Sequence, residues 1–144
     1  MEKIIKTVLG SIALLLLLSS CVDYAYTGYY EYVNESGHDI AFERYYYGEL
    51  QSSYNLPSGE SMRESRVSKG DVPEPLFLGP IKIVFDNERV LEYSHNKEGV
   101  SNEIFFNRNY TEIPTKDEYS QFFRWTFTPE HYEMAVPIES ENPQ

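Results

Sequence analysis

The sequence predicts an all-β protein, an antiparallel β-sandwich of immunoglobulin or transthyretin type with one short C-terminal helix. Thirteen tyrosines and eight phenylalanines, against one tryptophan, form a composition that favours strands over helices. About eight short runs of strand-forming residues are separated by turn formers roughly every 8–15 positions, which is typical of a sandwich. A small closed β-barrel has a similar pattern and is the alternative fold.

The amino-terminal residues have the pattern of a bacterial lipoprotein signal peptide. Lys3 and Lys6 precede an apolar run from Val8 to Leu18. This run is too short for a membrane-spanning helix, which needs about 20 apolar residues. The segment Leu18-Ser19-Ser20-Cys21, at the end of this run, resembles a lipobox. The resemblance implies cleavage before Cys21, a diacylglyceryl group on its sulfur and an acyl chain on its new amine. An ordinary secretory leader or an apolar first strand is the alternative.

The expected organisation is a signal peptide at 1–20, a lipidated tether at 21–28, a sandwich domain at 29–138 and a flexible tail at 139–144. Without residues 1–20 the chain has 22 acidic and 10 basic residues, a net charge of about −12. This acidity disfavours nucleic acid as a partner and permits a basic protein. The only cysteine is the expected lipid carrier, so the domain has no disulfide and must be held by hydrophobic packing.

The expected strands are 29–34, 40–47, 51–56, 61–67, 81–85, 90–93, 102–110 and 122–127. The first two are expected to form a hairpin, because the residues between them are dense in turn formers. The fourth is expected at a sheet edge, because its charged side chains discourage pairing with another chain. Residues 68–80, with three prolines, form the longest irregular connection.

The fifth and sixth strands are expected to form a hairpin whose register follows from the apolar pattern. A three-residue loop, Asn87 to Arg89, sets Phe85 opposite Leu91. A two-residue turn would set Ile83 opposite Glu92 on the core face. We favour the three-residue loop, because a slip of one residue would turn the apolar side chains outward.

The last part of the chain has two clear signals. In 102–110, Ile104, Phe106 and Tyr110 are expected to share one face of a strand. In 122–127, Phe123, Trp125 and Phe127 are expected to point inward. Thr128-Pro129-Glu130 predicts a helix start, since threonine can cap, proline suits the first position and glutamate complements the helix dipole. Pro137 limits that helix to about two turns.

The residues give little support for an enzyme. The chain has no G-x-S-x-G elbow, H-E-x-x-H motif, P-loop or glycine fingerprint. The three histidines are far apart in the sequence: His38, His95 and His131. Glu130, His131 and Glu133 do not share one helix face, and Asp86-Asn87-Glu88 fits a tight turn better than a calcium site. No catalytic residue, metal or cofactor is therefore expected.

Tyrosines are the main candidates for binding. Tyr45-Tyr46-Tyr47 ends the second expected strand, and alternation means that about half of the clustered tyrosine rings cannot lie in the core. An exposed tyrosine offers an apolar ring with a polar tip, which suits a sugar or a protein interface. Tyr45, Tyr46, Tyr47 and Trp125 are therefore candidate ligand-stacking residues. The alternative is that such rings only cover the ends of the sandwich.

Several motifs together resemble small lipoproteins of unknown function from Bacteroides-type bacteria. They are the lipobox, N-E-S-G-H-D-I at 34–40, L-P-S-G-E-S at 56–61, I-K-I-V-F-D-N at 81–87 and W-T-F-T-P-E-H-Y-E-M-A at 125–135. The resemblance implies a β-sandwich at the outer membrane and carries over no catalytic or binding residue. Val22 and Asp23 do not match the acidic run that sometimes marks export to the cell surface. The resemblance therefore does not assign the domain to one face of that membrane.

The leading hypothesis is a non-enzymatic, lipid-anchored accessory or binding module of the cell envelope, with an envelope protein or a glycan as partner. One alternative is a carbohydrate-binding lipoprotein of a glycan-uptake system. Another is an inhibitor of a basic hydrolase such as lysozyme, which the acidity of the chain permits.

Overall fold

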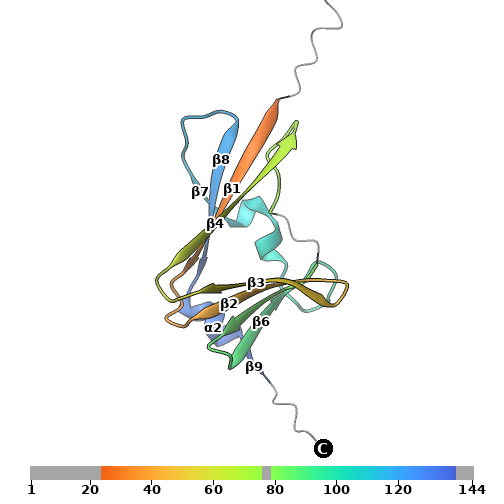
Figure 1. Cartoon of the computed structure of the whole chain (residues 1–144), viewed down its shortest axis with the longest axis vertical. Coiled ribbons are helices and arrows are strands. Elements are labelled where there is room, and N and C mark those ends of the chain that lie inside the picture. The colour runs from red at the N-terminus through yellow and green to blue at the C-terminus, as the bar shows by residue number, and fades with distance from the viewer. Residues whose placement is uncertain (1–23, 76–78, 139–144) are drawn as a thin grey trace, which may run out of the picture.

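The computed structural model describes residues 24–75 and 79–138, and these form two packed β-sheets (Figure 1). Sheet A has the strand order β4-β1-β8-β7, and sheet B has the order β3-β2-β5-β6-β9. The all-β sandwich is therefore confirmed. Within these two ranges no strand pairing joins one sheet to the other, so the alternative of a closed barrel is wrong.

Sheet A consists of β1 (Ala25–Asn34), β4 (Ser61–Lys69), β7 (Thr111–Ile113) and β8 (Ser120–Phe127). Sheet B consists of β2 (Ile40–Tyr46), β3 (Glu49–Leu56), β5 (Ile81–Phe85), β6 (Arg89–Tyr93) and β9 (Val136–Pro137). The helical elements are the 3₁₀ turns η1 (Glu103–Phe105) and η2 (Asn107–Asn109) and the α-helix α2 (Pro129–Met134). Named strands pair antiparallel, except that β1 and β8 are parallel.

The expected hairpin between 29–34 and 40–47 is wrong, because β1 and β2 lie in different sheets. The chain crosses between the sheets on an arch built around buried Asn34. The Asn34 Nδ2 donates to the carbonyl oxygens of His38 (2.7 Å) and Leu56 (2.8 Å). In a hairpin, backbone hydrogen bonds between the two strands would pair such carbonyl groups. Here the Asn34 side chain pairs them, so the turn-forming residues of this segment build an arch between the two sheets.

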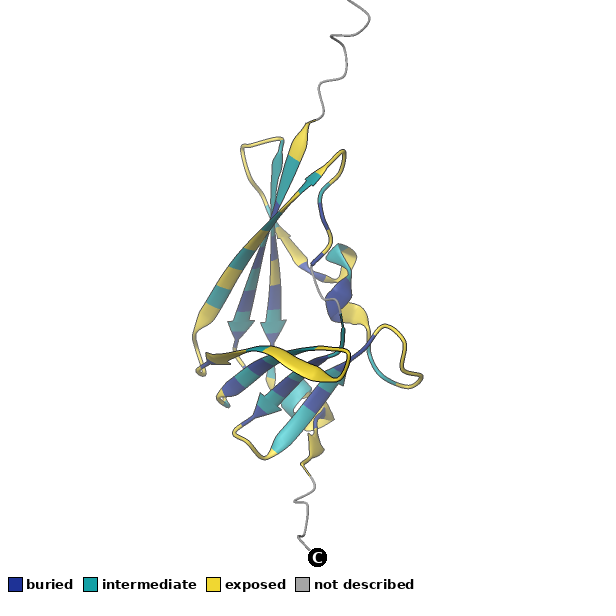
Figure 2. Cartoon of the chain, turned by 45° about the vertical axis from the view of Figure 1, so that its right-hand side comes forward, coloured by how far each residue is buried: buried dark blue, intermediate teal, exposed yellow. Residues whose placement is uncertain are grey.

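The buried residues lie between the sheets (Figure 2). The core that they form is rich in aromatic rings. Tyr30 and Tyr32 of β1 are fully buried on one face of the strand, and their neighbours on the other face are partly exposed. The Tyr30 hydroxyl donates to the Pro73 carbonyl and the Tyr32 hydroxyl to Glu64 Oε1 at 3.1 Å, so each buried polar tip has a partner. Burial raises the pKa of Tyr30 to about 12, which keeps that hydroxyl neutral.

The register of the β5–β6 hairpin differs from the prediction by two residues. Phe85 lies opposite Arg89 and Ile83 opposite Leu91, so the three-residue loop spans 86–88. Asp86 and Asn87 have φ values of 49° and 60°, the signature of a tight turn with two left-handed residues. A shift of two residues keeps every side chain on its face, so the apolar pattern could not distinguish the two registers. The predicted pairing of Phe85 with Leu91 is therefore wrong, whereas Ile83 lies opposite Leu91 and Ile81 opposite Tyr93.

The expected strand at 102–110 is also wrong, because this segment forms η1 and η2. Ile104 and its neighbour Phe105 are both buried, which a strand cannot achieve since adjacent side chains point to opposite faces. Hydrogen bonds from side chains to backbone carbonyls stabilise these two turns. Asn109 Nδ2 donates to the Glu103 carbonyl at 2.9 Å, and the Tyr110 hydroxyl donates to the Ile104 carbonyl at 2.7 Å.

The last strand and helix follow the prediction. Phe123, Trp125 and Phe127 of β8 are buried. Helix α2 begins at Pro129 after Thr128, whose backbone N–H donates to the Nδ1 of His131 at 3.0 Å. This is half of a capping box in which histidine takes the place of glutamate or glutamine.

Strand β1 begins at Ala25, four residues before the expected Tyr29. Residues 25–28 therefore belong to sheet A, where Ala25 lies opposite Lys69 of β4. At Gly28 any Cβ atom would lie 2.6 Å from the Tyr30 hydroxyl, so glycine lets that ring fold back along the strand. As a result, sheet A extends beyond sheet B at the amino-terminal end (Figure 1). The expected tail at 139–144 lies outside the described residues.

Candidate binding surface

The β2–β3 hairpin extends beyond its neighbours in sheet B (Figure 1). Strand β2 pairs with β5 only from Ile40 to Arg44, and its last two residues, Tyr45 and Tyr46, pair with β3 alone. The pairing register shifts between Arg44 and Tyr45, which is a β-bulge. Such bulges bend a strand and redirect its side chains.

The end of this hairpin is apolar and exposed. Tyr47 is 89% exposed, and Tyr46 and Leu50 beside it are 38% and 51% exposed. The rings of Tyr46 and Tyr47 have their centroids 4.3 Å apart with their planes inclined at 53°. A hydrogen bond with Tyr47 raises the pKa of Tyr46. We call Tyr46, Tyr47 and Leu50 the aromatic tip.

The backbone of the aromatic tip is held in one conformation. Tyr47 and Gly48 have φ values of 50° and 81°, as the two central residues of a type I′ hairpin turn require. At the base, the backbone N–H of Tyr45 donates to the Pro80 carbonyl at 2.9 Å. A Cβ atom at Gly79 would lie 2.1 Å from the Tyr45 carbonyl oxygen, so only glycine lets the 79–80 segment pass this close.

Tyr45 differs from the other two predicted tyrosines, because it supports the hairpin. Its hydroxyl donates to Glu43 Oε2 at 2.7 Å, and this bond raises the pKa of Tyr45 to about 12. The Lys82 Nζ lies 4.8 Å from the centre of its ring, so one ring face is occupied.

Trp125 is not a ligand-stacking residue, and the prediction that named it is wrong. Its side chain is only 7% exposed. Its ring packs against Tyr110 (5.2 Å between centroids) and edge-on against Tyr93 (6.0 Å). The alternation that placed Trp125 inward decides its position, and an inward ring cannot also face a sugar.

A second cluster, which sequence reasoning missed, joins three of the motifs quoted above. The His38 Nδ1 lies 2.6 Å from Asp86 Oδ2, and its ring stacks on Tyr132 with centroids 3.6 Å apart and planes 9° apart. The Arg89 guanidinium lies 4.9 Å from the centre of the Tyr132 ring. His38, Asp86 and Tyr132 come from three motifs that carry the resemblance, 34–40, 81–87 and 125–135. The sequence carries no local signal for this cluster, because its members are far apart along the chain.

This cluster contains a histidine–carboxylate pair, an arrangement that orients a catalytic base in hydrolases. In the described ranges, no serine, threonine or cysteine side chain is hydrogen-bonded to the His38 ring. Asp86 also accepts a bond from the Asp39 backbone N–H at 2.9 Å. The contacts therefore tie the β1–β2 arch, the β5–β6 turn and α2 together.

Metal and membrane signals are limited in the described part of the chain. No group of three or more histidine, cysteine, aspartate or glutamate side chains there could hold a metal ion.

A hollow of about 440 Å³ is lined by polar side chains that include Glu74, Arg108 and Glu112. Glu74 already accepts the Asn107 backbone N–H at 2.6 Å. No helix in ranges 24–75 and 79–138 has the length and apolar character to cross a bilayer.

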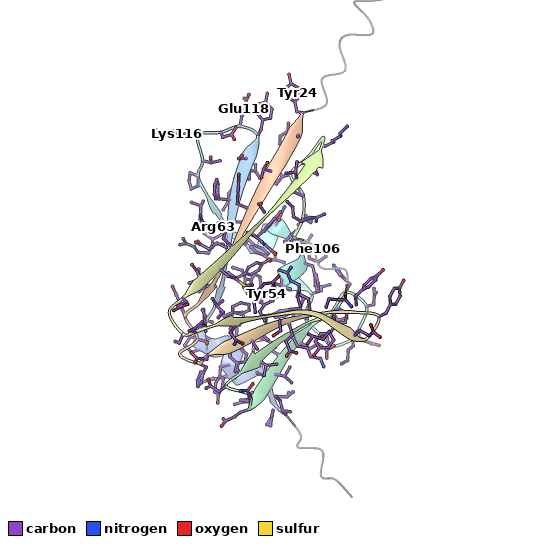
Figure 3. The ribbon with its side chains drawn as sticks, in the orientation of Figure 1. Tyr24, Tyr54, Arg63, Phe106, Lys116 and Glu118 are labelled. Carbon is purple, nitrogen blue, oxygen red and sulfur yellow. The ribbon has the colours of Figure 1, made fainter. Side chains whose placement is uncertain are left out.

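No family model, curated protein or solved structure matches the chain. The geometry of the described residues is therefore the basis for the proposed function. The predicted lipidation site, Cys21, lies outside the described residues. The described residues begin at Tyr24, three positions after Cys21, at the end of sheet A (Figure 3).

Proposed function

We propose that this chain is a lipid-anchored cell-envelope protein that binds another protein through its aromatic tip and catalyses no reaction. The observation that carries the proposal is the 89% exposure of Tyr47 on a fixed hairpin. Tyrosine is enriched at protein interfaces because its ring buries a large area at a low entropic cost. A hairpin whose shape is already set loses little further freedom on binding.

The geometry of the tip favours a protein groove over a sugar. The ring planes of Tyr46 and Tyr47 are inclined at 53°, so they present a ridge instead of a flat platform. Leu50, which lies opposite Tyr45 on β3, adds a half-exposed aliphatic side chain next to the turn. Trp125, the ring best suited to sugar stacking, is in the core. Figure 2 shows that the exposed residues continue along β3.

The envelope location rests on the lipobox at Leu18-Ser19-Ser20-Cys21 and on the resemblance to small Bacteroides-type lipoproteins. The charge of about −12 after residue 20 favours a basic partner, because complementary charge accelerates encounter and suppresses other partners. A basic hydrolase such as lysozyme belongs to this class of partner, and the ridge shape of the tip is suited to a cleft.

Photo-crosslinking from the tip tests this proposal. A photoreactive phenylalanine replaces Tyr47 in the acylated protein in its own cells. The matched control carries it at Tyr54, which lies on β3 of the same hairpin and is 47% exposed but is away from the turn. We expect a protein adduct from position 47 and little from position 54. Equal adducts at both positions, or none at position 47, would contradict a protein-binding tip.

Two binding assays separate the alternatives. Capture of lysozyme that weakens as salt rises, and that is lost in Tyr47→Asn, would identify a basic hydrolase as the partner. Retention of the wild type on an immobilised glycan, with loss in Tyr47→Asn, would favour the carbohydrate-binding alternative and overturn a protein partner.

A further inference from the structure

The amino-terminal end of sheet A carries a group of tyrosines separate from the aromatic tip. The Tyr24 and Tyr119 rings are stacked, with centroids 5.1 Å apart and planes 10° apart. Tyr26 adds a third ring 5.8 Å from Tyr119. We call Tyr24, Tyr26 and Tyr119 the tyrosine end. It lies on the part of sheet A that sheet B does not cover (Figures 1 and 3).

The rings of the tyrosine end are partly exposed. Tyr24 is 50% exposed, whereas Tyr26 and Tyr119 are half-buried. A hydrogen bond with Glu118 raises the pKa of Tyr119 to about 12. A neutral phenol with an exposed ring is the kind of side chain that concentrates at the boundary between hydrocarbon and water.

The predicted lipid is close to this end along the chain. Tyr24 is three positions after Cys21, and three residue steps span at most about 11 Å when fully extended. Because β1 begins at Ala25, the chain between the lipid and the sheet is shorter than the expected tether at 21–28. One headgroup layer is roughly 5–7 Å thick, so Tyr24 cannot lie far above it.

The charges around the tyrosine end fit an uncharged lipid surface. Lys69 lies opposite Ala25, and Lys116 lies in the loop before Tyr119. Asp117 and Glu118 lie in the same loop, and Figure 3 shows Lys116, Glu118 and Tyr24 at the same end of the molecule. A zwitterionic surface carries no net charge, so these mixed charges meet no strong repulsion there.

We propose that the tyrosine end rests in the headgroup layer of the membrane and fixes the orientation of the domain. This inference rests on the proposed lipid anchor at Cys21 and adds a contact surface and its lipid partner. An anchored domain is already at a high effective concentration at the bilayer, so even a weak affinity of three rings decides its orientation. The acyl chains attach the protein to the membrane, and the three rings set the orientation of the domain on it.

This orientation has a consequence for the aromatic tip. With the tyrosine end on the bilayer, sheet B and α2 lie on the side away from the membrane (Figure 1). The aromatic tip then projects to the side, where a neighbouring membrane protein or a soluble protein can reach it. A domain that tumbled on a flexible tether would not present the tip in one direction.

The test uses the acylated mature protein in vesicles of phosphatidylcholine and phosphatidylethanolamine. Acylated Cys21 has no free thiol, so Lys116→Cys provides one position for a nitroxide label near the tyrosine end. Glu88→Cys, in the exposed β5–β6 turn, is the reference position at the opposite end. The measurement is the collision rate of each label with a water-soluble nickel complex, relative to its collision rate with oxygen.

We expect the label at 116 to be shielded from nickel at least threefold more than the label at 88. The double variant Tyr24→Ser/Tyr119→Ser should remove this difference. Tyr24→Ser alone, which changes an exposed side chain ahead of the first strand, should reduce it, and Tyr24→Trp should preserve it.

The outcomes separate this inference from the anchor. Acylated protein that floats with the vesicles but shows equal nickel access at 116 and 88 overturns the inference alone. Shielding at 116 that persists in both serine variants overturns the role of the tyrosines. A chain that does not float with the vesicles overturns the anchor, and the inference fails with it.

Discussion

At Tyr47 the chain places a bulky aromatic residue in a left-handed conformation, with φ at 50°. Glycine, asparagine and aspartate are the residues that normally occupy this conformation. A tyrosine at this position gives up backbone stability, and its ring is 89% exposed, so it gains little from packing. A role in binding accounts for both features of this residue.

Replacing Tyr47 should therefore affect binding and leave folding intact. In Tyr47→Asn the new residue accepts the left-handed conformation, and no buried contact is lost. We expect the free energy of unfolding to stay within about 0.5 kcal/mol of the wild type. Partner binding should fall at least tenfold, which corresponds to about 1.4 kcal/mol. Urea unfolding and a binding titration measure the two effects, with Tyr54→Thr as the control.

Trp125 should show the opposite behaviour. Its ring is buried among Tyr93, Tyr110 and Phe127, so truncation leaves a cavity in the core. We expect Trp125→Ala to lower the free energy of unfolding by about 3–5 kcal/mol. A loss below about 1 kcal/mol in urea unfolding would mean that Trp125 does not lie in the core.

Residue positions were predictable from the sequence wherever one face of a strand is buried. Alternation correctly placed Phe123, Trp125 and Phe127 inward. The exposure of Tyr46 and Tyr47 could not be derived in this way, because it depends on where β5 stops pairing with β2. The His38–Asp86 contact joins residues 48 positions apart, and no local pattern predicts such a contact.

At the scale of elements, side chains decide what backbone propensity leaves open. The 34–40 segment has the composition of a hairpin turn, but Asn34 builds an arch from it. The 102–110 segment alternates like a strand, but adjacent Ile104 and Phe105 both enter the core. The β5–β6 pattern fixed the faces and left the register to Asp86 and Asn87. Tertiary contacts decide the first two cases, and the conformation of the turn residues decides the third.

The cap of α2 should make folding stability depend on pH. Burial lowers the pKa of His131 below its ordinary value of 6.5, and this effect exceeds the opposing effects of Glu130 and Glu103. The unfolded chain therefore binds the proton first, and the free energy of unfolding should fall as the pH drops below about 6.5. His131→Gln keeps an acceptor for the Thr128 N–H but cannot titrate.

The measurement compares urea unfolding of the wild type and His131→Gln at pH 7.5 and 5.5. We expect the variant to lose less stability over this interval. His38 and His95 are present in both proteins, so any contribution from them cancels in the comparison. An identical loss in the two proteins would show that His131 is not buried in its neutral form.

An ion cluster on the outer face of sheet A should stabilise three neighbouring strands. Glu31 of β1 lies 2.8 Å from the Arg63 guanidinium of β4 and 2.6 Å from that of Arg124 of β8. Hydrogen bonds from Arg63 and then Arg124 lower the pKa of Glu31 below its usual 4.5. Its contribution is therefore present above pH 4.5 and is lost as the pH falls through the lowered pKa.

Glu31→Gln should lower the free energy of unfolding at pH 7 by about 1 kcal/mol, the value typical of a partly exposed ion pair. The difference between variant and wild type should shrink as the pH falls below 4.5, because Glu31 then becomes protonated in both states. Unfolding at several pH values measures this. A difference that does not change with pH would assign the effect to packing instead of charge.

At the scale of the whole molecule, the two ends of the sandwich differ. One end carries the tyrosine end, three residues after the predicted lipid, and the other carries the His38–Asp86–Tyr132 cluster and α2. The two-layer β fold was predictable, because composition and turn spacing reflect the whole chain. The crossing of β1 and β2 into different sheets was not, because strand order depends on contacts distant in sequence.

The most direct test of a membrane-anchored binding module is the intact mass of the protein extracted from its own membranes. The account predicts a chain that begins at Cys21 and carries a diacylglyceryl group and a further acyl chain on its amine. A mass that includes residues 1–20, or a chain from residue 21 without acyl groups, would contradict it.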